Sequence, residues 1–186
     1  MEVLLVILAG WAAYYTLWML FARKVNLVKL TNPLPFREGL VWTVTWLLSV
    51  PLWFAAETVW KADWPYVFGF YAAFAFAIFV RLQLGTNWKP FAAQEANYTL
   101  ITTGPYRYLR HPLYFAQFLM CIFTAMACQK LVPAILFVCL PAIANRLRAQ
   151  SERDLLLKLF PEKYSAYRNG TFWGIVWQVR GLMPRS

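Results

Sequence analysis

The sequence predicts an all-α, polytopic membrane protein with about five transmembrane helices, and three observations lead to this fold class. Of the 186 residues, 61% are hydrophobic and only 14% are charged, whereas soluble domains are about 45–50% apolar and about 25% charged. The apolar residues gather in five stretches that approach the length of a membrane span. The Lys and Arg residues lie between these stretches, near their ends or in the C-terminal tail, and almost all of them fall on one side of the membrane that the stretches define.

The five stretches expected to span the membrane are residues 3–22, 40–56, 66–84, 113–128 and 131–147. The first is interpreted as a retained helix rather than a signal peptide, because it carries Glu2 and lacks a basic start and a clear cleavage site. Pro112 suits the first position of span four. Only residues 129 and 130 separate spans four and five, which predicts a tight helical hairpin followed by a cytoplasmic C-terminal helical region.

The basic residues orient these spans. Lys61 and Lys130 fall on one side of the membrane, and the other 16 of the 18 Lys and Arg residues fall on the opposite side. The positive-inside rule therefore predicts an outside N-terminus and a cytoplasmic C-terminus, in the plasma (inner) membrane if the source is a prokaryote. The net charge of +10 is attributed to topology and to contact with membrane lipids, and no nucleic-acid partner is expected.

Residues 1–186 are expected to form a single domain, because the composition gives no reason to divide them. Any chemistry is expected in about residues 85–186, which contain the two most polar regions assigned to the cytoplasmic side. Cys121, Cys128 and Cys139 lie in apolar runs without a CxxC pair or a nearby His. They are expected to be small buried residues, with no disulfide framework and no metal site.

The first polar cluster surrounds His111, the one His of the chain, in the segment GPYRYLRHPLY that runs from Gly104 to Tyr114. His111 is predicted to stand at the entrance of span four, where free helix N–H groups favour anions. The alternative is a basic interfacial collar with Tyr anchors.

The second cluster contains Arg148 and Glu152, which are four residues apart and share one helical face. Ionisable residues on the continuation of a span are functional candidates, and the alternative is a simple surface ion pair. The amphipathic stretch 155–167 is expected to lie on the membrane surface or to fold over the site.

Together, GPYRYLRHPLY and the segment RAQSERDLLLKLFPEKYSAY, which starts at Arg148, resemble the isoprenylcysteine carboxyl methyltransferases. These are integral-membrane enzymes that use S-adenosylmethionine. The resemblance covers about the C-terminal half of the chain. It departs from the family pattern at Pro161, where the family has Gly, and beside Glu152, where a second acid is common.

The resemblance implies that S-adenosyl-L-methionine is the cofactor, and that Arg148 is the catalytic residue on the substrate side. The residues that it implies for cofactor binding are Gln94, Tyr98, Thr99, Leu100, Ile101, Tyr106, His111, Pro112, Leu113, Tyr114 and Glu152. The acceptor is expected to be a lipophilic small molecule or lipidated substrate, foremost a prenylcysteine-like carboxylate. A carboxylate is already ionised and needs no general base, which favours this acceptor on chemical grounds.

Three alternatives remain open at this stage. The acceptor can be a phospholipid amine or a small thiol, for which only His111 or a Tyr offers a base. A non-catalytic membrane protein or small transporter is disfavoured, since no inverted repeat or mid-span acid pair is visible. A membrane reductase with a nicotinamide cofactor is disfavoured by the short chain.

Overall fold

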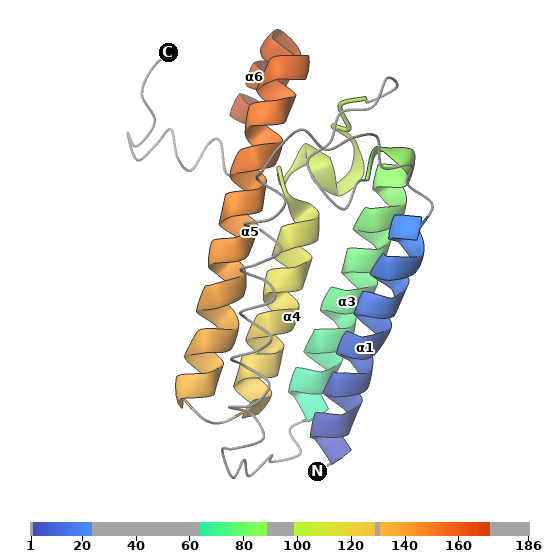
Figure 1. Ribbon diagram of the computed structural model, residues 1–186, viewed down its shortest axis with the longest axis vertical. Coiled ribbons are helices and arrows are strands. Elements are labelled where there is room, and N and C mark those ends of the chain that lie inside the picture. The colour runs from blue at the N-terminus through green and yellow to red at the C-terminus, as the bar shows by residue number, and fades with distance from the viewer. Residues whose placement is uncertain (1, 24–63, 89–98, 129–130, 172–186) are drawn as a thin grey trace.

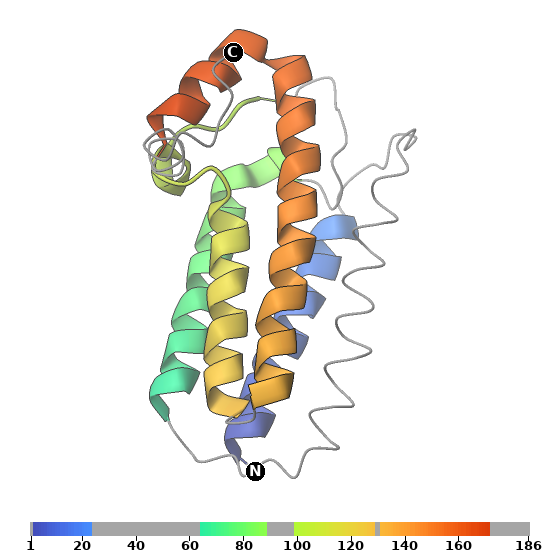
Figure 2. The same cartoon turned by 90° about the vertical axis from the view of Figure 1, so that its left-hand side faces the viewer.

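The computed structural model describes residues 2–23, 64–88, 99–128 and 131–171, and within these ranges it is all-helical. Four long helices run side by side as an elongated bundle, and a shorter helix lies across one end of it (Figure 1, Figure 2). The long helices are α1 (Glu2–Arg23), α3 (Trp64–Leu84), α4 (Pro112–Cys128) and α5 (Leu131–Leu159), and the short one is α6 (Pro161–Gly170). Two 3₁₀ turns, η1 (Gly85–Asn87) and η2 (Gly104–Arg107), lie at the same end as α6.

Four of the five predicted spans are helices at the predicted places, and the second, residues 40–56, lies outside the described residues. Among the described helices, α3 is long and apolar enough to cross a membrane. Shorter apolar runs, Leu5–Phe21 and Pro112–Ala127, lie in α1 and α4. Pro112 begins α4 as predicted, since the first helical position needs no N–H donor.

Trp11 of α1 contacts each of the other three long helices. Its indole N–H donates to the hydroxyl of Thr124 in α4 at 3.1 Å. Its ring packs edge-on against Phe70 of α3 at 5.6 Å and Phe137 of α5 at 5.9 Å. A side chain that is 2% exposed and bonded in this way fixes the mutual position of the helices.

The close packing of α3 on α4 depends on Gly69. A Cβ atom built there would lie 2.4 Å from the ring of Phe123, closer than any real contact allows. The absent side chain therefore lets the Phe123 ring settle directly on the α3 backbone.

Large apolar side chains also point outward from the bundle, as expected of helices that face lipid. Phe68 and Leu82 of α3 and Val132 of α5 are each more than 60% exposed. The prediction for the cysteines is correct for Cys121, which is buried, and wrong for Cys139, which is exposed. An apolar run does not distinguish a residue packed inside from one directed at lipid, because both surroundings are apolar.

The predicted amphipathic stretch 155–167 comprises the last turn of α5 and most of α6. Helix α5 continues to Leu159, and the chain turns at Phe160 before α6 begins at Pro161. Pro161 supplies no N–H and restricts the residue before it, so it ends α5 and starts α6. Helix α6 folds over the end of the bundle, which is one of the two placements predicted for this stretch (Figure 2).

Candidate functional site

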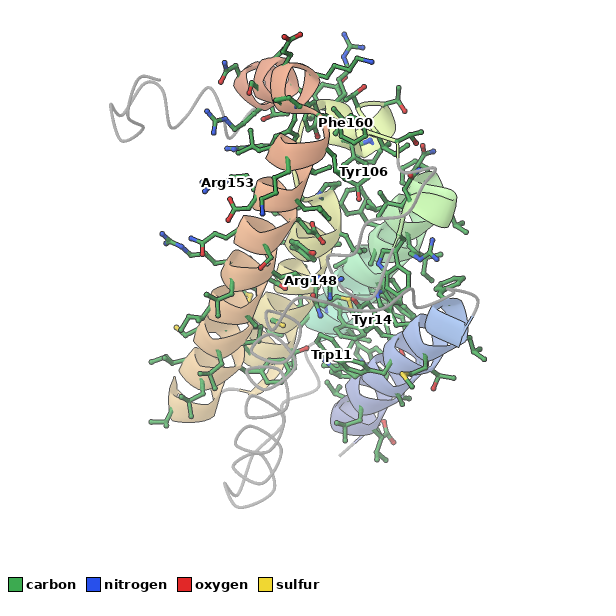
Figure 3. All side chains as sticks on the ribbon, turned by 45° about the horizontal axis from the view of Figure 1, so that its top comes forward. Trp11, Tyr14, Tyr106, Arg148, Arg153 and Phe160 are labelled. Atoms are coloured by element: carbon green, nitrogen blue, oxygen red, sulfur yellow. The ribbon has the colours of Figure 1, made fainter. Side chains whose placement is uncertain are left out.

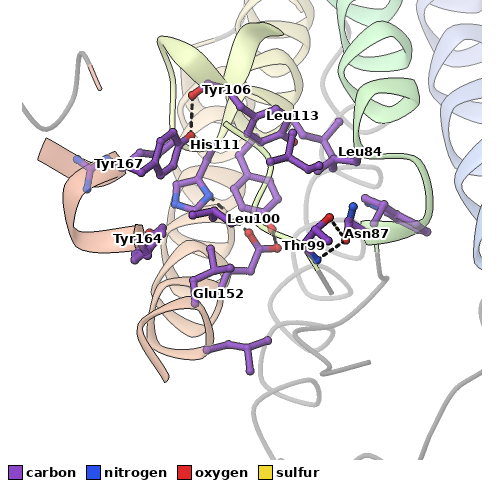
Figure 4. Close-up of a pocket in the computed structure, with 16 residues that line it drawn as sticks. Leu84, Asn87, Thr99, Leu100, Tyr106, His111, Leu113, Glu152, Tyr164 and Tyr167 are labelled. Carbon is purple, nitrogen blue, oxygen red and sulfur yellow. Dashed lines mark hydrogen bonds and ion pairs between the residues drawn. The ribbon is translucent and has the colours of Figure 1, made fainter. Parts of the chain in front are cut away.

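A pocket lies at the end of the bundle where α3 ends and α4 begins, and it extends beneath α6 (Figure 4). Both motifs found in the sequence contribute to it. Its lining residues are Leu84, Asn87, Trp88, Thr99, Leu100, Ile101, Tyr106, Arg110, His111, Leu113, Tyr114, Glu152, Leu155, Leu156, Tyr164 and Tyr167.

The turn before α4 directs the first motif into this pocket. Gly104 has φ of +61°, which a residue with a side chain adopts only at a cost. The η2 turn that follows buries Tyr106. The carbonyl of His111 then accepts the N–H of Phe115 at 3.1 Å, so His111 caps the start of α4. Backbone geometry therefore places the imidazole at the pocket wall.

Glu152 is the centre of the polar contacts in the pocket. Its carboxylate lies 3.5 Å from His111 Nδ1 and 3.6 Å from Arg148 Nε. The Tyr114 hydroxyl donates to Glu152 Oε1 and accepts from Arg148 Nε at 2.7 Å. Tyr114 therefore bridges the acid and the guanidinium, and its ring stacks on His111 with centroids 5.4 Å apart.

These contacts keep Glu152 ionised. Burial alone would raise the pKa of its carboxyl group, but the hydrogen bond from His111 and the charge of Arg148 oppose burial and outweigh it. The pKa of Glu152 therefore lies below its ordinary value. The side chain is still 30% exposed, so it offers a negative charge to a ligand in the pocket.

Aromatic and basic side chains from α6 and from the turn before α4 also line the pocket. The Tyr167 hydroxyl of α6 donates to the carbonyls of Tyr106 at 2.6 Å and Leu109 at 3.4 Å, which ties α6 to the turn before α4. Arg110 lies beside Tyr164 and Tyr167, and burial lowers the pKa of its guanidinium. Burial raises the pKa of both tyrosines, so they remain neutral hydroxyls.

Near the end of α3, Asn87 holds the segment that begins at Thr99. Its Oδ1 accepts the Thr99 N–H at 2.9 Å and the Thr99 hydroxyl at 3.2 Å. Arg81 stabilises the neighbouring turn, because its guanidinium lies 4.5 Å from the rings of Phe21 and Trp88 and donates to the Gly85 carbonyl.

The structure brings together most of the residues singled out in the sequence. Eight of them line the pocket: Thr99, Leu100, Ile101, Tyr106, His111, Leu113, Tyr114 and Glu152. Pro112 begins α4 and is not part of the lining. Arg148 is not part of it either, but its Nε donates to the hydroxyl of Tyr114, which lines the pocket. Gln94 and Tyr98 lie outside the described residues.

Several lining residues were not identified from the sequence. Asn87 and Trp88 lie outside both motifs, and Leu155 and Leu156 lie in the second motif without being singled out as site residues. Tyr164 and Tyr167 were visible as a Tyr-x-x-Tyr pair in the second motif, but their role depends on the fold of α6.

Comparison with known proteins supports the resemblance seen in the motifs. Residues 66–158 match the profile of the isoprenylcysteine carboxyl methyltransferase family. The chain is also 28% identical over 93 residues to the protein-S-isoprenylcysteine O-methyltransferase of Dictyostelium discoideum. This alignment covers 49% of the chain and 39% of the relative, so the chain spans only about two fifths of the length of the curated relative that it matches.

Proposed function

The chain belongs to the isoprenylcysteine carboxyl methyltransferase family, and on this premise we propose that it transfers a methyl group from S-adenosylmethionine to a lipophilic acceptor, foremost a prenylcysteine-like carboxylate. The observation that carries the proposal is the ionised Glu152 in a pocket with aromatic and basic walls, directly beside Arg148.

The chemistry of the pocket suits this cofactor, which has an amino group, a carboxylate, a sulfonium and an adenine ring. Glu152 and Arg110 both line the pocket. Glu152 would pair with the amino group of the cofactor, and Arg110 with its carboxylate. Tyr106, Tyr164 and Tyr167 also line the pocket, and their rings would pack against the adenine or the sulfonium. The pocket therefore contains a partner for each charged end of the cofactor.

The chain's own residues mainly orient the reactants. When bound, S-adenosylmethionine supplies an activated methyl group on sulfur, so the hard step belongs to the cofactor. Arg148 holds the acceptor carboxylate in one orientation. This lowers the entropic cost of reaching the geometry that methyl transfer needs. Tyr114 and Glu152 fix the Arg148 side chain, which is 18% exposed.

The apolar outer surface of the bundle supports an acceptor drawn from the bilayer. The described helices present large apolar side chains outward, whereas the pocket with its polar residues lies at the end of the bundle (Figure 4). We infer two routes to one site, with the lipophilic acceptor entering between helices and the water-soluble cofactor entering from the cytoplasm. The cytoplasmic placement of the pocket rests on the basic residues, since those near the pocket fall on the positive-inside side.

Calorimetric titration of the detergent-purified protein with S-adenosylhomocysteine tests the cofactor. Glu152→Ala removes a charge-assisted contact, so the dissociation constant should rise at least about tenfold. Asp154→Ala is the matched control, because Asp154 lies two residues further along the same helix, 58% exposed and paired with Arg153. A well-folded wild type that fails to bind would exclude a methyltransferase.

The acceptor is then identified by transfer of a labelled methyl group. An N-acetyl-S-prenylcysteine, a phospholipid amine and a small thiol are offered to the same preparation. Methylation of the prenylcysteine alone supports the proposal. Methylation of only the amine or the thiol would contradict the carboxylate acceptor and leave the cofactor assignment intact.

A further inference from the structure

Asn145 is a buried polar side chain with no use in the site described above. It lies on α5, its exposed fraction is 7%, and neither its amide nitrogen nor its amide oxygen has a hydrogen-bond partner among the described residues. A buried polar group without a hydrogen-bond partner is destabilising, and native structures contain few of them. An unpaired amide therefore points to a partner that is present only when a ligand binds.

The position of Asn145 indicates which ligand. Asn145, Arg148 and Glu152 are spaced by three and four residues, so they share one face of α5. Glu152 lines the cofactor pocket. Arg148 is not part of the lining, and its Nε donates to the hydroxyl of Tyr114, which is. Asn145 is about 4.5 Å further along the helix axis, on the side of Arg148 away from the pocket.

The surroundings of Asn145 are the interior of the bundle. Figure 3 shows Arg148 reaching from α5 toward Tyr14 of α1, and the Arg148 charge acts on that buried hydroxyl. On α4, Gln117 is three residues beyond Tyr114 and is 8% exposed. Because α4 and α5 run antiparallel and Tyr114 contacts Arg148, Gln117 lies near the level of Asn145. Polar side chains thus continue into the bundle past Arg148.

We propose that the Asn145 amide N–H donates a hydrogen bond to the acceptor carboxylate held by Arg148. This inference rests on the proposed function. A carboxylate has two oxygens and accepts several hydrogen bonds, so Arg148 and Asn145 together hold it from two directions. The amide thereby selects an anionic head group and orients it for methyl transfer.

Two nearly isosteric substitutions test the role of the amide. Asn145→Leu removes both polar atoms, and Asn145→Asp replaces the donor with a negatively charged acceptor. With N-acetyl-S-prenylcysteine, Asn145→Leu should lower kcat/KM about tenfold to a hundredfold. Asn145→Asp should lower it further, because its carboxylate repels the acceptor and competes for Arg148. Binding of S-adenosylhomocysteine should not change in either variant.

The control is Ile143→Ala, which alters a side chain on the same helix that is 52% exposed and should leave kcat/KM unchanged. The thermal midpoint shows whether each variant folds, and Asn145→Ala replaces Asn145→Leu if leucine does not fit. An Asn145→Leu enzyme that is stabilised and keeps the wild-type kcat/KM would show that the amide has no role in binding. That outcome contradicts this inference alone.

Failure of the proposed function gives a different pattern. A wild type that methylates an amine and no carboxylate, with Asn145→Asp more active than Asn145→Leu, would contradict the carboxylate acceptor and this inference together. A wild type that does not bind S-adenosylhomocysteine would overturn both at an earlier step.

Discussion

Replacing Tyr114 with Phe removes one oxygen from the middle of the polar contacts and leaves the ring in place. The hydroxyl donates to Glu152 and accepts from Arg148 Nε at 2.7 Å. The stacking on His111 at 5.4 Å does not need the hydroxyl. The substitution therefore isolates the contribution of two hydrogen bonds to charged groups.

The size of the effect follows from the same geometry. A hydrogen bond to a charged group contributes about 1.5–3 kcal/mol, so two such bonds set the upper limit. Arg148 Nε and Glu152 Oε1 are already 3.6 Å apart, and a small movement lets them pair directly. Direct pairing recovers about half of the loss, which leaves a destabilisation of about 2 kcal/mol.

Thermal unfolding in detergent measures this change. A loss of about 2 kcal/mol lowers the midpoint by about 4–8 °C in a chain of this size. Tyr108→Phe is the control, because Tyr108 is 64% exposed and its substitution should change stability by less than about 0.5 kcal/mol. Equal midpoints for the two variants would refute the bridging role of Tyr114.

A double-mutant cycle separates the bridge from a general loss of packing. If Tyr114 acts through Glu152, Tyr114→Phe should cost less in a Glu152→Gln background than in the wild type. Strictly additive costs would mean that the hydroxyl contributes independently of the carboxylate.

Three further outcomes are expected. Because the pKa of Glu152 is lower in the folded protein than the ordinary 4.5, its contribution to stability is complete above that value and is lost as pH falls through the folded pKa. Thermal midpoints of the wild type should therefore drop in acid, and Glu152→Gln should flatten this part of the profile. Tyr167→Phe removes the 2.6 Å bond to the Tyr106 carbonyl, so it should raise the KM for S-adenosylmethionine and spare the KM for the acceptor. The Lys163→Cys thiol should react with a membrane-impermeant maleimide in inside-out vesicles. Reaction in intact cells would contradict the proposed cytoplasmic C-terminus.

Two parts of the result depend on local information and could be predicted from the sequence. The long helices follow from apolar runs of the length of a span, and α4 begins at Pro112 because proline needs no N–H donor there. The pairing of Arg148 with Glu152 follows from helical periodicity alone. These features arise within one segment, so distant parts of the chain do not alter them.

Other parts depend on contacts between segments that are far apart in the chain. Tyr114 and Glu152 are 38 residues apart, and only the packing of α4 on α5 brings the hydroxyl to the carboxylate. The exposure of Cys139 and the burial of Asn145 depend in the same way on which face of α5 meets its neighbours. A span that is apolar around most of its circumference does not reveal this face, because lipid and protein interior are equally apolar. The sequence by itself determined the helices and their polar motifs, and tertiary packing decided which side chains meet, because contacts across helices have no local signal.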